Sequence, residues 1–208
     1  MTIHLNTQAD LEEAIHALVK QDPRLKPIFD IAGMPALRRR EPGYAGLAAI
    51  ICGQQLSTAS AAAIWTRVSA AFNPFHHDTL RKARAGRLGR LGLSAAKIKT
   101  LKNLARELAA ERLNLDVLAN EDADAAHNTL TALHGIGPWT ADIYLLFCLG
   151  HGDAWPAGDL AVQEAVKKRE GVLGGEPKAN AVLNKIPVAK WSSPKAKIAA
   201  GKKPGSKT

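Results

Sequence analysis

The chain has 208 residues, of which 46% are hydrophobic, 23% charged and 5% aromatic, a composition typical of a globular protein with one sizeable core. Its formal net charge is +9, from 28 lysines and arginines against 19 acids, which favours a polyanionic partner such as nucleic acid. Two cysteines are too few for a cysteine-ligated iron–sulfur cluster or a structural zinc site, and no apolar run approaches the length of a membrane span.

Helical periodicity recurs along the chain while strand patterns are nearly absent, so the sequence predicts an all-α fold. A first helix over residues 11–20 is preceded by two candidate caps, Thr7 and Asp10, and ends near Pro23. A loop over residues 35–43 separates it from the helices that follow. These are predicted over residues 44–52, 57–72, 77–85, 95–110, from Asn120 or Asp122 to residue 134, from Pro138 onward, and over 159–168 and 179–184.

The positive charge is concentrated in two segments. Residues 81–106 hold nine lysines or arginines and residues 188–208 hold six lysines, with no acid in either segment. Such segments favour nucleic acid, with a solvated surface and a solubilising tail as the alternative. The sequence predicts a flexible basic tail over residues 191–208 after one helical domain over residues 1–190. An N-terminus without a signal peptide and cysteines within apolar runs predict a cytoplasmic protein, nucleoid-associated if the source is bacterial.

The stretch LHGIGPWTA, residues 133–141, places two glycines immediately before Pro138 and an apolar helix. Gly135 can adopt the left-handed conformation that ends a helix, and Gly137 leaves room for another molecule to approach the backbone. Such a turn presents backbone N–H groups at the positive end of a helix, which makes it a candidate phosphate site. The alternative is a plain helical hairpin with a glycine turn.

Four ordered segments carry a resemblance to a known family. They are LHGIGPWTADIYLLFCLG (133–150), DAWPAGDLAVQEAV (153–166), AIICGQQLSTASAAAIWTRV (49–68) and LGLSAAKIKTLKNLA (91–105). Together they resemble the helix–hairpin–helix superfamily of DNA glycosylases, and within it the 3-methyladenine DNA glycosylase II (alkylpurine glycosylase) family in a compact form. The resemblance implies a two-lobed helical fold with the active-site cleft between the lobes. It also implies a DNA phosphate site at the hairpin residues His134, Gly135, Ile136, Gly137 and Thr140.

Asp159 stands at the start of the predicted helix 159–168, where an aspartate is an ordinary N-cap. The resemblance aligns it with the family's catalytic aspartate. A carboxylate in that role stabilises the positive charge that builds on the deoxyribose as the base departs, and it orients or deprotonates the attacking water. Because a helix N-terminus favours the ionised form, the two roles are compatible. Asp142, the rival acid near the start of the Pro138 helix, is assigned no catalytic role.

Two tryptophans are candidates for the base pocket. Trp139 occupies the position at which lyase-competent members of the superfamily carry a Schiff-base lysine, so the resemblance implies a monofunctional enzyme. Its indole is a candidate for stacking on a flipped cationic purine, with core packing as the alternative. Trp155 is a candidate wall of the same pocket, whereas Trp65 is predicted to lie in the core.

The turn GQQLS, residues 53–57, contains two adjacent glutamines that are hard to explain as core residues. An enzyme that extrudes a nucleotide must fill the vacated stack. By alignment with the family, Gln55 occupies this DNA-wedge position and Leu56 is the second candidate, while Gln54 supports the turn. The alternative is a polar loop between helices with Ser57 as a helix cap.

Beyond Trp191 the chain departs from the family pattern, because a lysine-rich segment replaces the expected final apolar helix. The sequence as a whole predicts a monofunctional DNA glycosylase that removes alkylated purines, of the 3-methyladenine and 7-methylguanine type, from double-stranded DNA in base-excision repair. We expect no metal ion or organic cofactor in the chemistry, no membrane partner and a monomeric state. The alternatives are a helix–hairpin–helix module that binds lesions without excising them, and a glycosylase for deaminated or mismatched bases.

Overall fold

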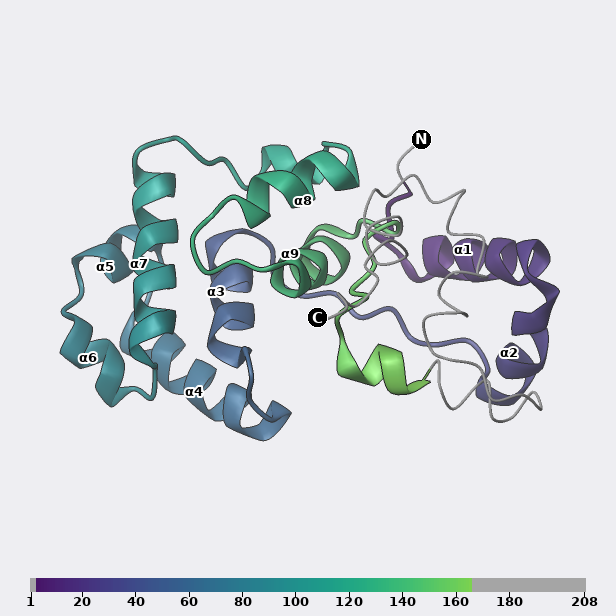
Figure 1. Ribbon diagram of the computed structural model, residues 1–208, viewed down its shortest axis with the longest axis horizontal. Coiled ribbons are helices and arrows are strands. Elements are labelled where there is room, and N and C mark those ends of the chain that lie inside the picture. Colours follow the sequence, from purple (N-terminus) through teal and green to yellow (C-terminus); the bar gives the residue numbers. More distant parts are fainter. Residues whose placement is uncertain (1–2, 166–208) are drawn as a thin grey trace, which may run out of the picture. The chain divides into compact units, whose positions relative to one another are not determined.

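The computed structural model describes residues 3–165, which fold into a succession of helices (Figure 1). The α-helices are α1 (Gln8–Gln21), α2 (Lys26–Ala32), α3 (Gly43–Gly53), α4 (Thr58–Ala71), α5 (His77–Lys82), α6 (Ala85–Arg90), α7 (Ala95–Ala109), α8 (Ala123–Thr131) and α9 (Pro138–Tyr144). Shorter turns are η1 (Pro23–Leu25), η2 (Val117–Ala119) and the π-helical turn η3 (Leu145–Leu149), and residues 160–165 are also helical.

Within residues 3–165 extended pairing is confined to one backbone bridge, between His4 and His151, which confirms the predicted all-α fold. No helix in this part of the chain combines the length and the apolar character needed to cross a bilayer. The expected helix 179–184, Trp191 and the expected tail 191–208 lie outside the described residues.

The described part of the chain divides into two compact units. Among the described residues, the first unit contains Arg38–Ala154 together with Ile3 and His4, and the second contains Leu5–Leu37 and Trp155–Ala165. The glycine hairpin and the GQQLS turn therefore belong to the first unit, and Asp159 belongs to the second.

The core of the first unit is built around α3, whose sequence GYAGLAAIICG is apolar almost throughout. Helix α7 contacts α3 (Figure 1), and α4 and α9 contact it as well. The buried residues of α7 are spaced as in an amphipathic helix, and they are Ile98, Thr100, Leu101, Leu104 and Ala105. Because α3 packs against all three helices, it anchors both the turn that follows it and the hairpin that precedes α9.

Four predicted helix starts are confirmed by their cap geometry, because capping depends on residues that are adjacent in the chain. Thr7 forms a reciprocal capping box with Asp10 at α1. The side-chain oxygens of Ser57, Ser94 and Asp122 accept backbone N–H bonds at the starts of α4, α7 and α8.

Two short helices, α2 and α6, are absent from the sequence-based expectation. Helix α6 contains Gly86 and Gly89, which lower helix propensity, and its N-cap Arg84 makes no side-chain capping bond. Its packing against α7, with Leu88 fully buried, supplies the stability that local sequence does not. The helix expected over residues 77–85 is accordingly wrong in extent: α5 ends at Lys82 and a separate helix begins at Ala85.

Helix α9 continues into the π turn η3, so its last turn contains one more residue than a regular α-helix would. Gly150, with φ +80°, ends the turn, and the His151 N–H donates to the Leu145 carbonyl at 3.0 Å. The His151 side chain is fully buried, and its Nε2 lies 2.9 Å from the Leu118 carbonyl. Gly150 and the two His151 contacts thus define the path of the chain after α9.

Candidate functional site

The glycine hairpin, residues 133–137, joins α8 to α9 and is held against α7. Gly135 has φ +82°, a conformation that side chains rarely adopt. A Cβ placed on it would overlap the Thr100 hydroxyl and lie 2.9 Å from the Thr100 Cβ and Cγ2 atoms. The Ile136 N–H donates to the Leu133 carbonyl at 3.1 Å, and the Ile136 side chain is buried. Glycine is therefore required at position 135 by backbone conformation and by close packing.

Gly137 differs from Gly135 in what it requires. It is the N-cap of α9 with φ −89° and ψ 172°, an extended backbone that any residue adopts. Nothing lies within 4 Å of the position that a Cβ would occupy there. Pro138 follows at the first helical position, as predicted, and His134 and Gly135 are exposed. What glycine provides at 137 is open space beside the first N–H groups of a helix, where an anion is favoured.

The GQQLS turn, residues 53–57, links α3 to α4 and presents its middle residues to solvent. Gln55 is exposed and has φ +56°, a left-handed conformation that is uncommon for a residue with a side chain. Leu56 is 40% exposed, and its N–H donates to the Gly53 carbonyl at 3.2 Å. The Ser57 hydroxyl accepts the Ser60 N–H at 3.2 Å. Ser57 therefore caps α4, as expected if the turn is a polar loop between two helices. Both candidate wedge residues are nevertheless available for contact with another molecule.

Gln54 connects the GQQLS turn to the glycine hairpin. Its Nε2 donates to the Thr140 hydroxyl at 2.9 Å and to the Gly135 carbonyl at 3.3 Å. Thr140 is buried, so its hydroxyl faces Gln54 and the protein interior. The sequence indicated support of the turn by Gln54, but these partners lie 81 and 86 residues away and no local pattern reveals them.

Lys97 of α7 provides a second tie to the end of α3. Its Nζ donates to the Cys52 carbonyl at 2.8 Å. Burial lowers the pKa of Lys97 from its ordinary value, and the nearby Cys52 thiol opposes this shift. The bond satisfies one of the last carbonyls of α3, which have no partner within the helix. The stem of the GQQLS turn is therefore attached both to α7 and to the hairpin.

Asp159, in the second unit, occupies the N-cap position of the helix that begins at residue 160. Its Oδ1 accepts the N–H groups of Ala161 at 2.9 Å and Val162 at 3.2 Å. Its own N–H donates to the Pro156 carbonyl at 2.8 Å, which closes the turn before the helix. These bonds confirm the predicted capping role, and both the bonds and the helix dipole favour a charged carboxylate. The catalytic role stays a prediction.

The tryptophans occupy different settings. Trp139 is half-buried at the start of α9 and packs against the core of the first unit, so part of its indole remains accessible. Trp155, in the second unit, is 37% exposed. Trp65 packs against the core and meets the Phe75 ring edge-on at 4.9 Å, as predicted for a core residue.

Asp142 lies in α9 but is 2% exposed. Its Oδ1 is 3.7 Å from the Nε2 of His127, which is itself buried in α8. Asp142 and His127 thus form a buried pair between adjacent helices.

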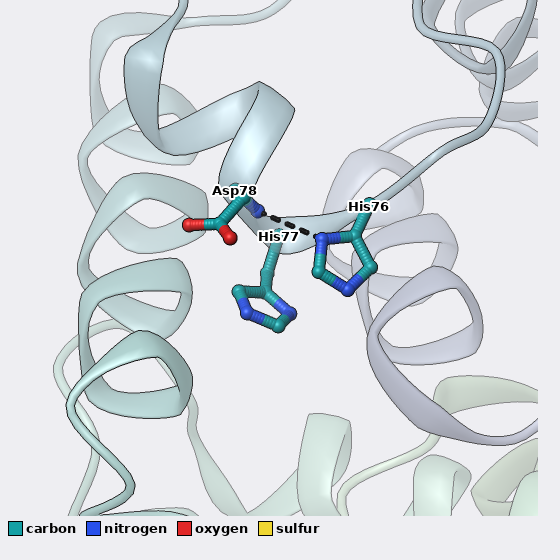
Figure 2. Close-up of side chains that lie close together, drawn as sticks. All are labelled: His76, His77 and Asp78. Carbon is teal, nitrogen blue, oxygen red and sulfur yellow. Dashed lines mark hydrogen bonds between the residues drawn. The ribbon is translucent and has the colours of Figure 1, made fainter.

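One group of side chains in the described part of the chain has the composition of a metal site. Figure 2 shows His76, His77 and Asp78 at the start of α5, with one ligand atom from each within 4.8 Å of the others. The His76 Nδ1 accepts the Asp78 N–H at 3.3 Å, and the Asp78 carboxylate pairs with Arg81 at 3.0 Å. A metal ion would have to compete with Arg81 and bind His76 through Nε2. We therefore assign His76 the role of helix cap at α5.

Comparison with known proteins identifies the family. The family model described as HhH-GPD superfamily base excision DNA repair protein matches residues 48–186, a span that includes the GQQLS turn, the glycine hairpin and Asp159. The chain belongs to this superfamily. The helix–hairpin–helix resemblance read from the four sequence segments is thereby confirmed.

Three known proteins resemble the chain in sequence or in fold. A Mycobacterium tuberculosis protein named as a probable bifunctional transcriptional activator and DNA repair enzyme, AlkA, is 31% identical over 174 residues, which cover 79% of this chain but 34% of that protein. The crystal structure of a DNA-3-methyladenine glycosidase from Bacillus halodurans superposes with a TM-score of 0.73 at 26% identity, covering 96% of this chain and 89% of that one. Schizosaccharomyces pombe 3-methyladenine DNA glycosylase, solved in complex with abasic DNA, shares the fold with a TM-score of 0.71 at 24% identity, over 88% and 90% of the two chains. The chain thus spans about a third of the mycobacterial relative and most of both structural relatives.

Proposed function

We propose that this chain is a monofunctional DNA glycosylase that hydrolyses alkylated purines, of the 3-methyladenine and 7-methylguanine type, from double-stranded DNA and acts as a monomer. The observation that carries the proposal is the combination, in one HhH-GPD chain, of the open glycine at position 137 with the N-cap carboxylate of Asp159. The first suits a phosphate and the second suits a cationic sugar.

Asp159 supplies the carboxylate in the proposed reaction. The bond between C1′ and the purine nitrogen breaks, and the electron pair leaves with the base. An alkylated purine that was cationic departs as a neutral molecule and therefore does not need a strong general acid. The carboxylate stabilises the positive charge that remains on the sugar and accepts a proton from the water that attacks C1′. The two N–H bonds to Oδ1 hold the carboxylate in one orientation during this step.

Trp139 supports both the monofunctional assignment and a role in base recognition. At the position where lyase-competent relatives carry a lysine, an indole cannot form a Schiff base with the sugar, so the product is an intact strand with an abasic site. The partly accessible indole offers a π face to an electron-poor purine. Trp155, with its exposed ring, is proposed as a second aromatic surface for the base.

The glycine hairpin and the GQQLS turn hold the DNA in this proposal. The open backbone at Gly137 contacts a phosphate, which positions the duplex without reading its sequence. The exposed Gln55 side chain enters the stack that the flipped nucleotide vacates, with Leu56 beside it. Both elements bind duplex DNA through features that are independent of the damaged base.

The test is an excision assay with Asp159→Asn and a matched control. Asp122 caps α8 in the same way, because its Oδ1 accepts the N–H groups of Asp124 and Ala125. Asparagine caps helices about as well as aspartate, so neither Asp159→Asn nor Asp122→Asn should lower stability appreciably. We expect Asp159→Asn to slow excision by about 100-fold or more with DNA binding retained, and Asp122→Asn to behave as the wild type.

Free base, abasic sites and strand breaks are measured in turn on methylated duplex DNA. Release of free base without direct strand breaks supports the proposal. Near-normal excision by Asp159→Asn would refute the assignment of that residue. Tight binding to damaged duplex with no base released by the wild type would instead indicate a lesion-binding module.

A further inference from the structure

The two DNA-binding loops proposed above are joined by one side chain. Gln54 lies between Gly53, the last residue of α3, and Gln55, the proposed wedge. Its two amide N–H groups are directed at the hairpin, one to the Thr140 hydroxyl at 2.9 Å and the other to the Gly135 carbonyl at 3.3 Å. A carbonyl only accepts hydrogen bonds, so the –NH₂ group of the carboxamide must face Gly135 and the orientation of the side chain is fixed.

The surroundings make this connection stiff. Gly135 is held against Thr100 by close packing, and Thr140 is 2% exposed, so neither partner can follow a displaced Gln54. On the other side, the Gln54 N–H donates to the Ile51 carbonyl, and Lys97 holds the Cys52 carbonyl. The carboxamide therefore spans two well-anchored elements.

We propose that Gln54 is a positioning residue that keeps the wedge and the phosphate-binding hairpin at a fixed separation on the DNA. Gln55 has a left-handed backbone at φ +56°, and the Gln54 side chain directly before it is bonded to Gly135 of the hairpin and to Thr140 of α9. A phosphate bound at Gly137 then lies at a set distance from the base step into which Gln55 inserts. This inference rests on the proposed glycosylase function and adds to it a residue that touches neither the base nor the sugar.

The test replaces Gln54 by methionine, which keeps the length of the side chain and removes both donors. Gln21→Met, an exposed position at the end of α1, is the matched control. We expect Gln54→Met to slow single-turnover excision at saturating DNA by about 10- to 100-fold, since small misplacements of positioning groups have effects of this size. Affinity for undamaged duplex should change by about twofold or less, and Gln21→Met should match the wild type.

Insertion is measured separately with a 2-aminopurine placed beside an abasic-site analogue, because its fluorescence reports unstacking without any bond cleavage. We expect Gln54→Met to lower this signal, and we expect the effects of Gln54→Met and Thr140→Val to be non-additive. A wild-type signal and rate in Gln54→Met would overturn the inference. A lower melting temperature accompanied by similar fold losses in duplex affinity and excision rate would also overturn it, because that pattern indicates a purely structural role. If wild-type protein releases no base, the proposed function fails while the fluorescence measurement still decides the role of Gln54.

Discussion

Replacing each hairpin glycine by alanine should separate the stability of the fold from its binding to DNA. At Gly135 the new methyl group has no space, because it overlaps the Thr100 hydroxyl and approaches two further Thr100 atoms at 2.9 Å. A left-handed backbone costs a residue with a side chain about 1–2 kcal/mol, and overpacking costs about 1–3 kcal/mol. Gly135→Ala should therefore lower the free energy of unfolding by about 2–5 kcal/mol.

Gly137→Ala should have the opposite profile. Its φ of −89° suits alanine and no atom lies within 4 Å of the new methyl group, so stability should stay within about 1 kcal/mol of the wild type. The methyl group does occupy the space through which a phosphate would reach the backbone. Loss of one hydrogen bond to a charged group costs about 1.5–3 kcal/mol, which corresponds to a roughly 10- to 100-fold weaker duplex affinity.

Thermal unfolding and duplex-binding titrations at constant salt measure these two quantities. Thr100→Ala in the Gly135→Ala background should restore part of the lost stability, because it removes two of the three clashing atoms. Wild-type DNA affinity in Gly137→Ala would refute the phosphate-binding role of the hairpin. Wild-type stability in Gly135→Ala would show that the packing against Thr100 is not as tight as the structure indicates.

The remaining predictions concern the wedge, the buried thiols and a buried histidine. Gln55→Ala should slow excision about tenfold while changing undamaged-duplex binding much less, since insertion matters after flipping; equal losses in both assays would contradict the wedge role. Burial raises the pKa of Cys52 to about 12 and of Cys148 to about 11, so iodoacetamide at pH 8 should label the native protein far more slowly than the urea-unfolded protein, as followed by mass spectrometry. Burial lowers the pKa of His151 below its ordinary value, so the unfolded state binds a proton at this side chain more readily than the folded state does. The contribution of neutral His151 to the free energy of unfolding is therefore complete above about pH 6.5 and falls as the pH drops toward the folded-state pKa. Melting temperatures of the wild type and of His151→Gln, plotted against pH between about 5 and 8, should differ in slope.

The sequence predicted those features that depend on neighbouring residues. The caps Thr7, Ser57, Ser94 and Asp122 were identifiable because a cap bonds to N–H groups two or three residues away. The glycine motif likewise gave the position of the hairpin, since a left-handed residue followed by a proline at the first helical position has a local signature. Helix α8 nevertheless ends at residue 131, before the predicted residue 134, because the chain tightens when the Leu133 N–H bonds to the Leu130 carbonyl.

The features that escaped sequence reasoning depend on residues far apart in the chain. The bonds from Gln54 to Gly135 and Thr140, and the contact of Gly135 with Thr100, arise because α3, α7 and α9 pack together. The requirement for glycine at 135 was attributed to backbone conformation alone, whereas the neighbouring threonine is an equally strong reason. The available sequence signal for the bond between the turn and the hairpin was a pair of adjacent glutamines after an apolar helix. That signal does not indicate which glutamine faces the hairpin.

The π turn at the end of α9 determines where the chain can lose a residue at least cost. A π turn fits one extra residue into a single turn, so removing one residue from Leu145–Leu149 would restore a regular α-helical turn and leave the direction of the downstream chain nearly unchanged. His151 should therefore keep its place beside the Leu118 carbonyl after such a deletion. A deletion of one residue within this turn is expected to be less disruptive than a deletion in a regular α-helix, where each residue lost turns the later side chains by about 100°.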